Sequence, residues 1–306
     1  MGALIAAVIL SGRALAPLGQ IASLATRFQQ ARLAMQGVNE IVRRPVERER
    51  QTHYLTVKDI QGEFRFSDVS FSYKSGLPEA LSGLSLSIRP GERVGIIGSI
   101  GCGKSTLLKM MVGLYRQNRG QITLDGVALQ QLDPSFVRDK VFLLEQNPRL
   151  FLGTLRENLQ LSRLPGSLSD VDMINAAGRF GFDCFIRHHP RGLDMQIGEG
   201  GLGLSGGQRQ MVALTRMVLG SPRVVLLDEP TTGLDLQTES VVLKGLSHWS
   251  RGRTMVVVTH RLQVLNIVDR IVVMNEGRVM MDGSRDEILK KLSGKQQNDE
   301  NRPAAS

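Results

Sequence analysis

A glycine-rich segment with one lysine is the first feature that could do chemistry. Gly98–Thr106 reads GSIGCGKST and follows an apolar run at Val94–Ile97. The spacing G-x-x-x-x-G-K-S lets backbone N–H groups surround a phosphate chain at a helix N-terminus. Lys104 is expected to reach the β- and γ-phosphates, and the Ser105 hydroxyl to bind Mg²⁺. The predicted nucleotide-binding residues of this loop are Gly98, Ser99, Ile100, Gly101, Cys102, Gly103, Lys104, Ser105 and Thr106.

Two adjacent acidic residues follow a second apolar run. Asp228 and Glu229 lie near the end of the segment RVVLLDEP. A carboxylate at the end of a buried strand is costly without a nearby cation, so we expect Asp228 to hold Mg²⁺ directly or through one of its ligands. Glu229 is placed to polarise the attacking water as a general base. The competing interpretation is a carboxylate pair that is merely solvated.

A further glycine motif lies between these two segments. Leu204–Gln210 reads LSGGQRQ, and at this motif the sequence resembles the ATP-binding cassette family. The resemblance implies that Ser205, Gly206, Gly207 and Gln208 bind an ATP molecule held by a second copy of the chain. A hydroxyl, a glycine-rich backbone and a helix N-terminus form a second anion site. The implied assembly is a head-to-tail homodimer that encloses two ATP molecules.

The other motifs of that family follow in the expected order, and the match covers about residues 62–292. By resemblance, Tyr73 in FSY stacks on adenine, and Gln146 in LEQNPRLF senses Mg²⁺ and the attacking water. Asp235 ends TGLD, the loop that communicates across the dimer, and His260 in VVVTH orients the catalytic glutamate. Taken alone, Tyr73 and His260 would more simply be core or capping residues. The predicted catalytic residues are Glu229, His260 and Gln146, and the predicted Mg²⁺ ligands are Ser105, Gln146 and Asp228.

Three segments resemble exporters in particular. They are GTLRENL at Gly153–Leu159, IGEGGLGLSGGQ with Glu199, and the N-terminal stretch from Ser11 to Val42, which is similar to the end of the last membrane helix in type I secretion ATPases. The resemblance implies export of a protein or peptide across the inner membrane, with the nucleotide-binding domain on the cytoplasmic side. The implied partners are the transmembrane domain of an exporter, largely missing from this chain, a periplasmic adaptor and an outer-membrane channel.

Some positions depart from the type I pattern. Those exporters more often carry a basic residue at the position of Ser99 and a serine at that of Cys102, and Met195–Ile197 also differs from the commoner sequence. None of these changes removes a backbone donor to phosphate. They leave an exporter of lipids or drugs as the alternative to protein export.

The sequence also predicts the strands that position these motifs. Short β-rich runs at Phe64–Tyr73, Leu84–Ile88 and Val94–Ile97 precede the phosphate loop. Continuous apolar runs at 224–227, 255–258 and 271–274 indicate strands buried on both faces, as in a mainly parallel sheet. The predicted fold is α/β: a P-loop NTPase with an ABC-type mixed sheet, an antiparallel β subdomain and a helical signature subdomain, preceded by a long N-terminal helix.

The N-terminal part is expected to belong to a membrane segment. Met1–Leu10 is almost wholly apolar but only about half as long as a spanning helix, which favours the stump of a membrane helix over a buried core helix. Apolar residues then recur at helical spacing to Arg43, which predicts one long amphipathic helix that stops at Pro45 and needs a partner, unless it folds back on the domain. The predicted domains are 1–50, a truncated last transmembrane helix with its cytoplasmic extension; 51–61, a linker; 62–292, the ABC nucleotide-binding domain; and 293–306, a disordered tail.

Composition limits the rival functions. The 306 residues with 42% hydrophobic content suit one large core or two modest ones, and the two distant cysteines do not suit a secreted disulfide scaffold. A net charge of +9 would fit a soluble cassette ATPase of DNA repair or translation, but no long basic block is present and no nucleic-acid partner is expected. A non-hydrolysing regulator is disfavoured because Asp228, Glu229 and His260 are all present.

Overall fold

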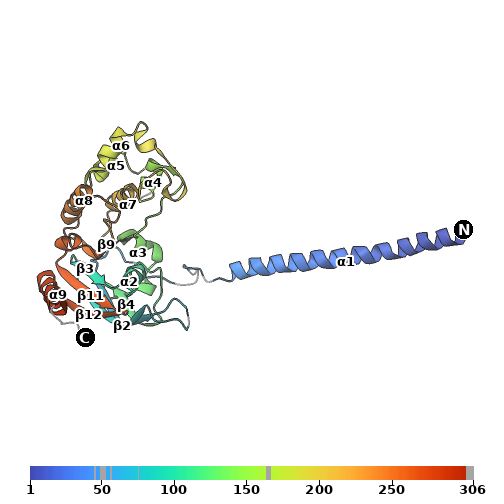
Figure 1. Ribbon diagram of the computed structural model, residues 1–306, viewed down its shortest axis with the longest axis horizontal. Coiled ribbons are helices and arrows are strands. Elements are labelled where there is room, and N and C mark those ends of the chain that lie inside the picture. Colours follow the sequence, from blue (N-terminus) through green and yellow to red (C-terminus); the bar gives the residue numbers. More distant parts are fainter. Residues whose placement is uncertain (45, 49–52, 56, 75, 163–166, 301–306) are drawn as a thin grey trace. The chain divides into compact units, whose positions relative to one another are not determined.

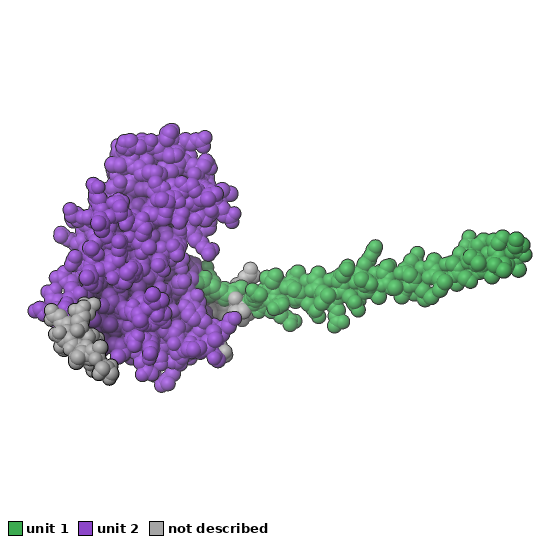
Figure 2. All heavy atoms as spheres, viewed as in Figure 1, with its two compact units in different colours: residues 1–52 green, residues 53–306 purple. Residues whose placement is uncertain are grey.

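The chain divides into two units, residues 1–52 and 53–306 (Figure 2). The computed structural model describes residues 1–44, 46–48, 53–55, 57–74, 76–162 and 167–300. Unit 1 holds a single long helix, and unit 2 holds the sheets and the remaining helices (Figure 1).

Unit 1 is built from helix α1 (Gly2–Val42). The predicted apolar stump and the helix that follows it are one element, and all its side chains are exposed. Over its whole length the apolar side chains do not gather on one side, because the first ten residues are apolar on every side. Among the described residues, α1 is the one helix that is long and apolar enough to cross a membrane. Its identity as a transmembrane helix stays a prediction.

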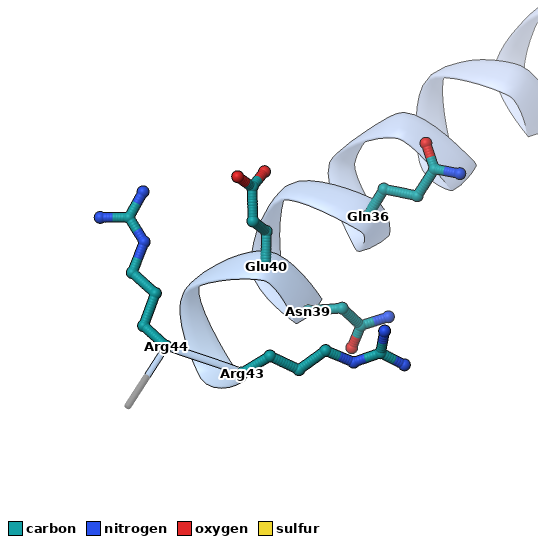
Figure 3. A pocket seen from close by; sticks show the side chains of 5 residues that line it. All are labelled: Gln36, Asn39, Glu40, Arg43 and Arg44. Atoms are coloured by element: carbon teal, nitrogen blue, oxygen red, sulfur yellow. The ribbon is translucent and has the colours of Figure 1, made fainter. Parts of the chain in front are cut away.

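The C-terminal end of α1 is polar. Figure 3 shows five side chains that project outward from the last turns and the residues just after them: Gln36, Asn39, Glu40, Arg43 and Arg44. Arg43 is the C-cap residue, where a positive charge interacts favourably with the negative end of the helix dipole. This end of the helix therefore suits water rather than lipid.

Two sheets form the framework of unit 2. The antiparallel sheet has the order β2-β1-β4-β5, and the larger sheet has the order β12-β11-β3-β10-β9-β6. All neighbours in the larger sheet are parallel except β11 and β12. The strands are β1 (Phe64–Phe71), β2 (Leu81–Ile88), β3 (Arg93–Gly98), β4 (Arg119–Leu124), β5 (Val127–Ala128), β6 (Val141–Leu144), β9 (Val224–Asp228), β10 (Thr254–Val258), β11 (Arg270–Asn275) and β12 (Arg278–Ser284).

The central strands are buried on both faces. Every residue of β9 and β10 is buried. Alternate residues point to opposite faces of a sheet, and in β9 Val225 and Leu227 join one hydrophobic cluster while Val224 and Leu226 join the other. The first cluster lies under the helices α4 to α7, and the second joins the antiparallel sheet and α2. The predicted mainly parallel sheet is confirmed.

Helices α4 to α7 gather at one end of unit 2 (Figure 1). Three of the helices begin with a capping box, at Thr154, Ser169 and Ser205, so their start points follow from local sequence. The helices of unit 2 are α2 (Lys104–Met111), α3 (Pro134–Lys140), α4 (Leu155–Gln160), α5 (Asp170–Gly178), α6 (Asp183–His188), α7 (Gly206–Gly220), α8 (Leu236–Trp249) and α9 (Arg285–Glu300). Shorter elements are η1 (Leu129–Gln131), η2 (Gly192–Asp194), η3 (Glu199–Gly201), η4 (Val264–Ile267), β7 (Gly153–Thr154) and β8 (Gln196–Ile197).

The two ends of unit 2 differ from the expected boundaries. Part of the stretch 51–61, expected to be a linker, packs on the domain: Leu55 bridges to Leu132, and Ile60 is buried. At the other end, the backbone of α9 continues to Glu300, past Ser293 where disorder was expected. Pro45, the predicted end of the first helix, and residues 301–306 lie outside the described residues.

Candidate nucleotide site

The site is built at one edge of the larger sheet. β3, β10, β9 and β6 are parallel neighbours in register, so their carboxyl ends lie side by side. In α/β sheets this edge is where ligands bind. The segments that leave these four ends carry most of the predicted residues: the loop from Gly98, then Thr259 and His260, then Glu229, then Gln146.

The phosphate loop needs glycine at two positions. Gly98 has a φ of 156°, and a Cβ there would lie 2.1 Å from the Met274 carbonyl oxygen. Gly103 has a φ of 98°, and a Cβ there would lie 2.3 Å from the Ala80 carbonyl oxygen. Helix α2 begins directly after Gly103, so the loop ends at a helix N-terminus that favours an anion.

Two side chains of the loop differ in exposure. Ile100 is fully exposed, whereas the Cys102 side chain is only 3% exposed and packs in the hydrophobic core. The loop therefore offers its backbone at position 102 and not the thiol. The Lys104 ammonium donates hydrogen bonds to the carbonyl oxygens of Gly98 at 2.9 Å and Ser99 at 2.8 Å. This geometry holds a cation against the loop.

Asp228 stands at the end of β9 and is 7% exposed. Burial raises the pKa of its carboxyl group, as does the negative charge of Glu229, whereas a hydrogen bond from Ser105 and the charges of Lys104 and Lys109 act in the opposite direction. Asp228 and Ser105 thus form an oxygen-only pair of groups, of the kind that suits Mg²⁺. The structure brings together two of the three predicted Mg²⁺ ligands.

Glu229 is held in place by two neighbours. Its carboxylate accepts a hydrogen bond from His260 Nδ1 at 2.6 Å and another from the Thr259 hydroxyl at 3.2 Å. An ionised carboxylate only accepts, so Nδ1 carries the proton in this pair. The backbone of Glu229 has a φ of 50°, which is uncommon outside glycine, and its N–H donates to the Val258 carbonyl at 2.9 Å. Such backbone conformations concentrate at functional sites.

Tyr73 follows β1 of the antiparallel sheet, and Gln146 follows β6 of the larger sheet. The Tyr73 hydroxyl is 2.7 Å from the Thr106 hydroxyl, and its ring packs edge-on against Phe71 and Tyr115. The residue is 52% exposed, which leaves ring surface available for stacking. Gln146 is exposed two residues after β6, and in the described part of the chain its side chain has no hydrogen-bond partner.

The signature motif serves a local structural role within one chain. The Ser205 hydroxyl accepts from the Gln208 N–H at 3.2 Å, and Gln208 Oε1 accepts from the Ser205 N–H at 2.8 Å. A Cβ at Gly207 would lie 2.9 Å from the Gly233 carbonyl oxygen, so this motif packs on the TGLD loop. Helices α7 and α2 lie in different parts of unit 2 (Figure 1). Among the described residues, no hydrogen bond or ion pair links Ser205 to Lys104, whose polar partners lie in their own motifs.

Asp235 caps helix α8. Its carboxylate accepts hydrogen bonds from the backbone N–H groups of Gln237 and Thr238 and from the Thr238 hydroxyl at 2.7 Å. These bonds lower the pKa of the Asp235 carboxyl group, with the Thr238 hydroxyl as the largest cause. The residue is exposed, so its cap leaves it accessible to a second chain.

An ion pair between the buried Glu239 and the partly buried Arg261 was not predicted. Glu239 is 2% exposed, and its Oε1 accepts from Arg261 Nη1 at 2.8 Å and from the Thr231 hydroxyl at 2.7 Å. Arg261 Nη1 also donates to the Thr231 carbonyl at 3.0 Å. These bonds tie the segments after β9 and β10 to α8. The sequence signal was an arginine directly after His260 and a glutamate in the first turn of a helix.

The fold and site define a P-loop nucleotide-binding domain, and comparisons with known proteins agree. Residues 81–232 match the model of the family described as ABC transporter. The sequence is 35% identical over 294 residues, 96% of this chain, to the leukotoxin translocation ATP-binding protein LktB of Mannheimia glucosida and to that of Mannheimia haemolytica. This chain spans 41% of the length of those relatives.

A solved structure gives the same result. The chain is similar to a structure described as a bacterial Atm1-family ABC exporter with ATP bound, with a TM-score of 0.80 and 29% identity, over 91% of this chain and 48% of that one. This chain belongs to the ABC transporter family and carries its ATP-binding domain. The predicted fold class is confirmed.

Proposed function

We propose that this chain binds ATP with Mg²⁺, hydrolyses the ATP and thereby powers export through a membrane domain. The observation that carries the proposal is the 2.6 Å hydrogen bond between Glu229 and His260, at the sheet edge that also carries the Lys104 loop. The carboxylate is thereby oriented before any substrate arrives. The family assignment supports the same activity.

The residues divide the chemistry of hydrolysis among them. Lys104 would exchange its loop carbonyl partners for β- and γ-phosphate oxygens, with a charge-assisted gain. Glu229 would accept the proton of the attacking water as the new bond to the γ-phosphorus forms and the bond to the ADP oxygen breaks. His260 would keep Glu229 in position through Nδ1, and because its side chain is 77% exposed, Nε2 would be available to the γ-phosphate.

The residues present fit Mg²⁺. Ser105 and Asp228 would hold it, with Gln146 completing the protein ligands from the end of β6. The hydrogen bond between Ser105 and Asp228 already places two oxygen donors together, and the raised pKa of the Asp228 carboxyl group reflects a buried site that favours a cation. When bound, Mg²⁺ neutralises charge that develops on the phosphate oxygens.

A second copy of the chain would complete each ATP site. Ser205 and Gly206 are exposed at the N-terminus of the 15-residue helix α7, where backbone N–H groups and the helix dipole favour a phosphate. Gly207, Gln208 and Asp235 would contribute from the same surface. Because Lys104 and Ser205 bond only within their own motifs in the described part of one chain, the arrangement supports an ATP-bound head-to-tail dimer.

An exposed apolar surface supports coupling to a membrane domain. Phe151, Leu152 and Leu202 are 65%, 76% and 76% exposed. The pairing of β7 with β8 joins the segment after Gln146 to the segment that contains Glu199, just before the signature motif. A partner that covers these side chains would sense both segments at once. We infer that this surface receives the cytoplasmic part of a transmembrane domain.

The exported molecule would be a protein or peptide, in a type I secretion-like transporter. The support is the similarity to leukotoxin translocation proteins, together with helix α1, which is long enough to span a membrane. The chain would lie at the inner membrane with unit 2 on the cytoplasmic side. A periplasmic adaptor and an outer-membrane channel would complete the machine, and a lipid or drug exporter is the alternative.

The test is the substitution Glu229→Gln in the purified chain. Glutamine keeps the shape of the side chain but does not take a proton from water, so ATP should bind while phosphate release falls by about a hundredfold or more. Unhydrolysed ATP should then hold two chains together. We expect an ATP-dependent dimer by light scattering, and monomers with ADP, which lacks the bridging γ-phosphate.

The control is Glu287→Gln, which makes the same change on the surface of α9 in an ion pair with Lys291. It should release phosphate at the parent rate. A Glu229→Gln chain that also releases phosphate at the parent rate would remove Glu229 from the mechanism.

A further inference from the structure

The turn between β11 and β12 lies against the phosphate loop. Asn275 pairs with Arg278, so Glu276 and Gly277 form a two-residue turn, with φ values of 46° and 74°. Two successive positive φ values mark the tight hairpin turn whose twist suits antiparallel strands. β11 runs parallel to β3 with Met274 opposite Gly98, which brings the turn to the start of the loop.

The turn and the last two residues of β11 contact the phosphate loop at three places. The Gly277 N–H donates to the Cys102 carbonyl oxygen at 3.1 Å, and the Ser99 hydroxyl donates to Asn275 Oδ1 at 3.0 Å. The Met274 carbonyl oxygen occupies the space that a Cβ at Gly98 would need. The Ser99 contact is made by its side chain, whereas the Cys102 contact is made by its backbone carbonyl oxygen.

The opposite side of the turn meets the antiparallel sheet. The Ser82 N–H, in β2, donates to the Gly277 carbonyl oxygen at 3.1 Å. A Cβ at Gly277 would lie 2.9 Å from the Ala80 carbonyl oxygen and 2.9 Å from the Leu81 Cα. The same Ala80 oxygen limits Gly103 at the end of the phosphate loop. The turn is thus wedged between the loop and the start of β2.

We propose that this turn is a positioning element of the nucleotide site, which fixes the phosphate loop relative to the antiparallel sheet that carries Tyr73. Adenine on Tyr73 and phosphates in the loop belong to one ligand, so the spacing of the two contacts decides how well both form at once. A site held at the right spacing before binding loses less free energy to ordering. The proposal rests on the proposed nucleotide site, and it assigns Gly277, Asn275 and Ser99 to its support.

Gly277→Ala provides the first test, because the chain offers a matched control. Gly252 has the same φ of 74°, but a Cβ there would meet nothing within 4 Å. Both alanines would lie at the same positive φ, whereas only that at residue 277 would push against Ala80 and Leu81. With a fluorescent ATP analogue, we expect Kd to rise about tenfold or more for Gly277→Ala and to stay near the parent value for Gly252→Ala.

The kinetic readout separates positioning from general damage. Steady-state hydrolysis should show the loss of Gly277→Ala mainly in KM, with kcat at saturating ATP within about threefold of the parent, since Glu229 and His260 are not touched. Thermal unfolding without nucleotide should show a larger loss for Gly277→Ala than for Gly252→Ala, because only the former adds a clash with backbone atoms, and the kinetics are compared at a temperature where both variants are folded. A loss of kcat with unchanged KM would overturn the proposal.

A second pair of variants keeps the test open if Gly277→Ala fails to fold. Ser99→Ala and Asn275→Ala each remove one partner of the 3.0 Å hydrogen bond without a new clash. Each should raise Kd for the ATP analogue. The double variant should have a Kd no higher than that of the weaker-binding single variant, because both substitutions remove the same hydrogen bond. Additive losses would show that the pair is not coupled.

The outcomes distinguish this proposal from the proposed function. If the parent chain and Gly252→Ala fail to bind the ATP analogue, the nucleotide site itself is wrong. If both bind the analogue, and Gly277→Ala and Asn275→Ala bind it as tightly as the parent does, then only the positioning role of the turn is wrong.

Discussion

At the scale of residues, the site combines fixed groups with exposed ones. Glu229 is 8% exposed and receives hydrogen bonds from His260 and Thr259, whereas the His260 side chain is 77% exposed. These bonds orient the carboxylate without a ligand, so as the proposed general base it would need little reorganisation. The exposed imidazole can meet a phosphate from solution. This division suits a base that is aimed by its neighbours.

The ion pair between partly buried Arg261 and buried Glu239 should contribute to the stability of this arrangement. Arg261→Ala would leave the Glu239 carboxylate buried with only the Thr231 hydroxyl as partner. Removing the partner of a buried charged group costs about 1–3 kcal/mol when solvent can partly reach the site, as it can at Arg261. We expect a loss of this size in the free energy of unfolding, measured with urea. Phosphate release should also fall, since Thr231 lies two residues after Glu229.

The control for this prediction is the double variant Arg261→Ala with Glu239→Gln, in which no unpaired charge remains. It should be more stable than Arg261→Ala alone, because the uncompensated charge is the larger part of the loss. If instead the losses of the two single variants add in the double variant, the residues are not coupled.

At the scale of elements, strands and loops followed from local patterns, whereas long-range contacts did not. The runs at 224–227, 255–258 and 271–274 became β9, β10 and β11 because burial on both faces requires continuous apolar sequence. The phosphate loop was equally predictable, since its glycines meet steric limits within a short motif. The strands β7 and β8 were not predicted, because two residues are too few to show an alternating pattern.

The start of unit 2 shows why long-range contacts were not predicted from the sequence. The Asp125 carboxylate accepts hydrogen bonds from the backbone N–H groups of Gln61 at 2.6 Å and Glu63 at 2.7 Å. These groups are more than sixty residues apart in sequence, so no local spacing reports the contact. The link of the β11–β12 turn to Ser99 is of the same kind. Local sequence specifies elements, and tertiary contacts specify how they are held.

Helices α4 and α5 should loosen in acid through one arginine. Arg156 forms ion pairs with Asp170 and with Asp194, and its hydrogen bonds are the largest cause of the lowered pKa of both carboxyl groups. The unfolded chain therefore binds these protons at higher pH than the folded chain does. The stabilisation is present above the ordinary pKa of about 4 and is lost as the pH falls through the lowered folded values.

The measurement is urea unfolding between about pH 6 and pH 3 for the parent and for Arg156→Ala. The parent should be the more stable of the two at pH 6, and the difference should shrink toward pH 3. The control is Arg65→Ala, which removes an exposed ion pair with Glu63 in the antiparallel sheet. A parent and an Arg156→Ala chain that lose stability in parallel would contradict the prediction.

At the scale of the whole molecule, three exposed regions would need partners. Helix α1 exposes apolar side chains along its length, and unit 2 exposes its signature motif and the Phe151 region. A membrane domain would cover the first and the Phe151 region, and a second chain the signature motif. The proposed contact of the signature motif with a second chain leads to a test in which two defective chains complement each other.

The last prediction combines Lys104→Ala in one chain with Gly206→Asp in another, both in a Glu229→Gln background that retains ATP. Lys104→Ala removes the cation that holds the phosphates. Gly206→Asp places a negative charge on the signature surface without a clash in its own chain, because the nearest atom to a Cβ there is Arg209 Nη2 at 3.9 Å. Each chain alone spoils both sites of a symmetric dimer, so neither should form ATP-dependent dimers.

In the mixture, one site of a mixed dimer takes Lys104 from the Gly206→Asp chain and Gly206 from the Lys104→Ala chain, so it is complete. The other site carries both defects. We therefore expect ATP-dependent dimers to reappear on mixing, with about one ATP per dimer where the Glu229→Gln parent holds about two. Light scattering with bound-nucleotide counting measures both quantities. If mixing restores no dimers although each chain is folded, the two motifs do not meet across a dimer, and each chain binds ATP by itself.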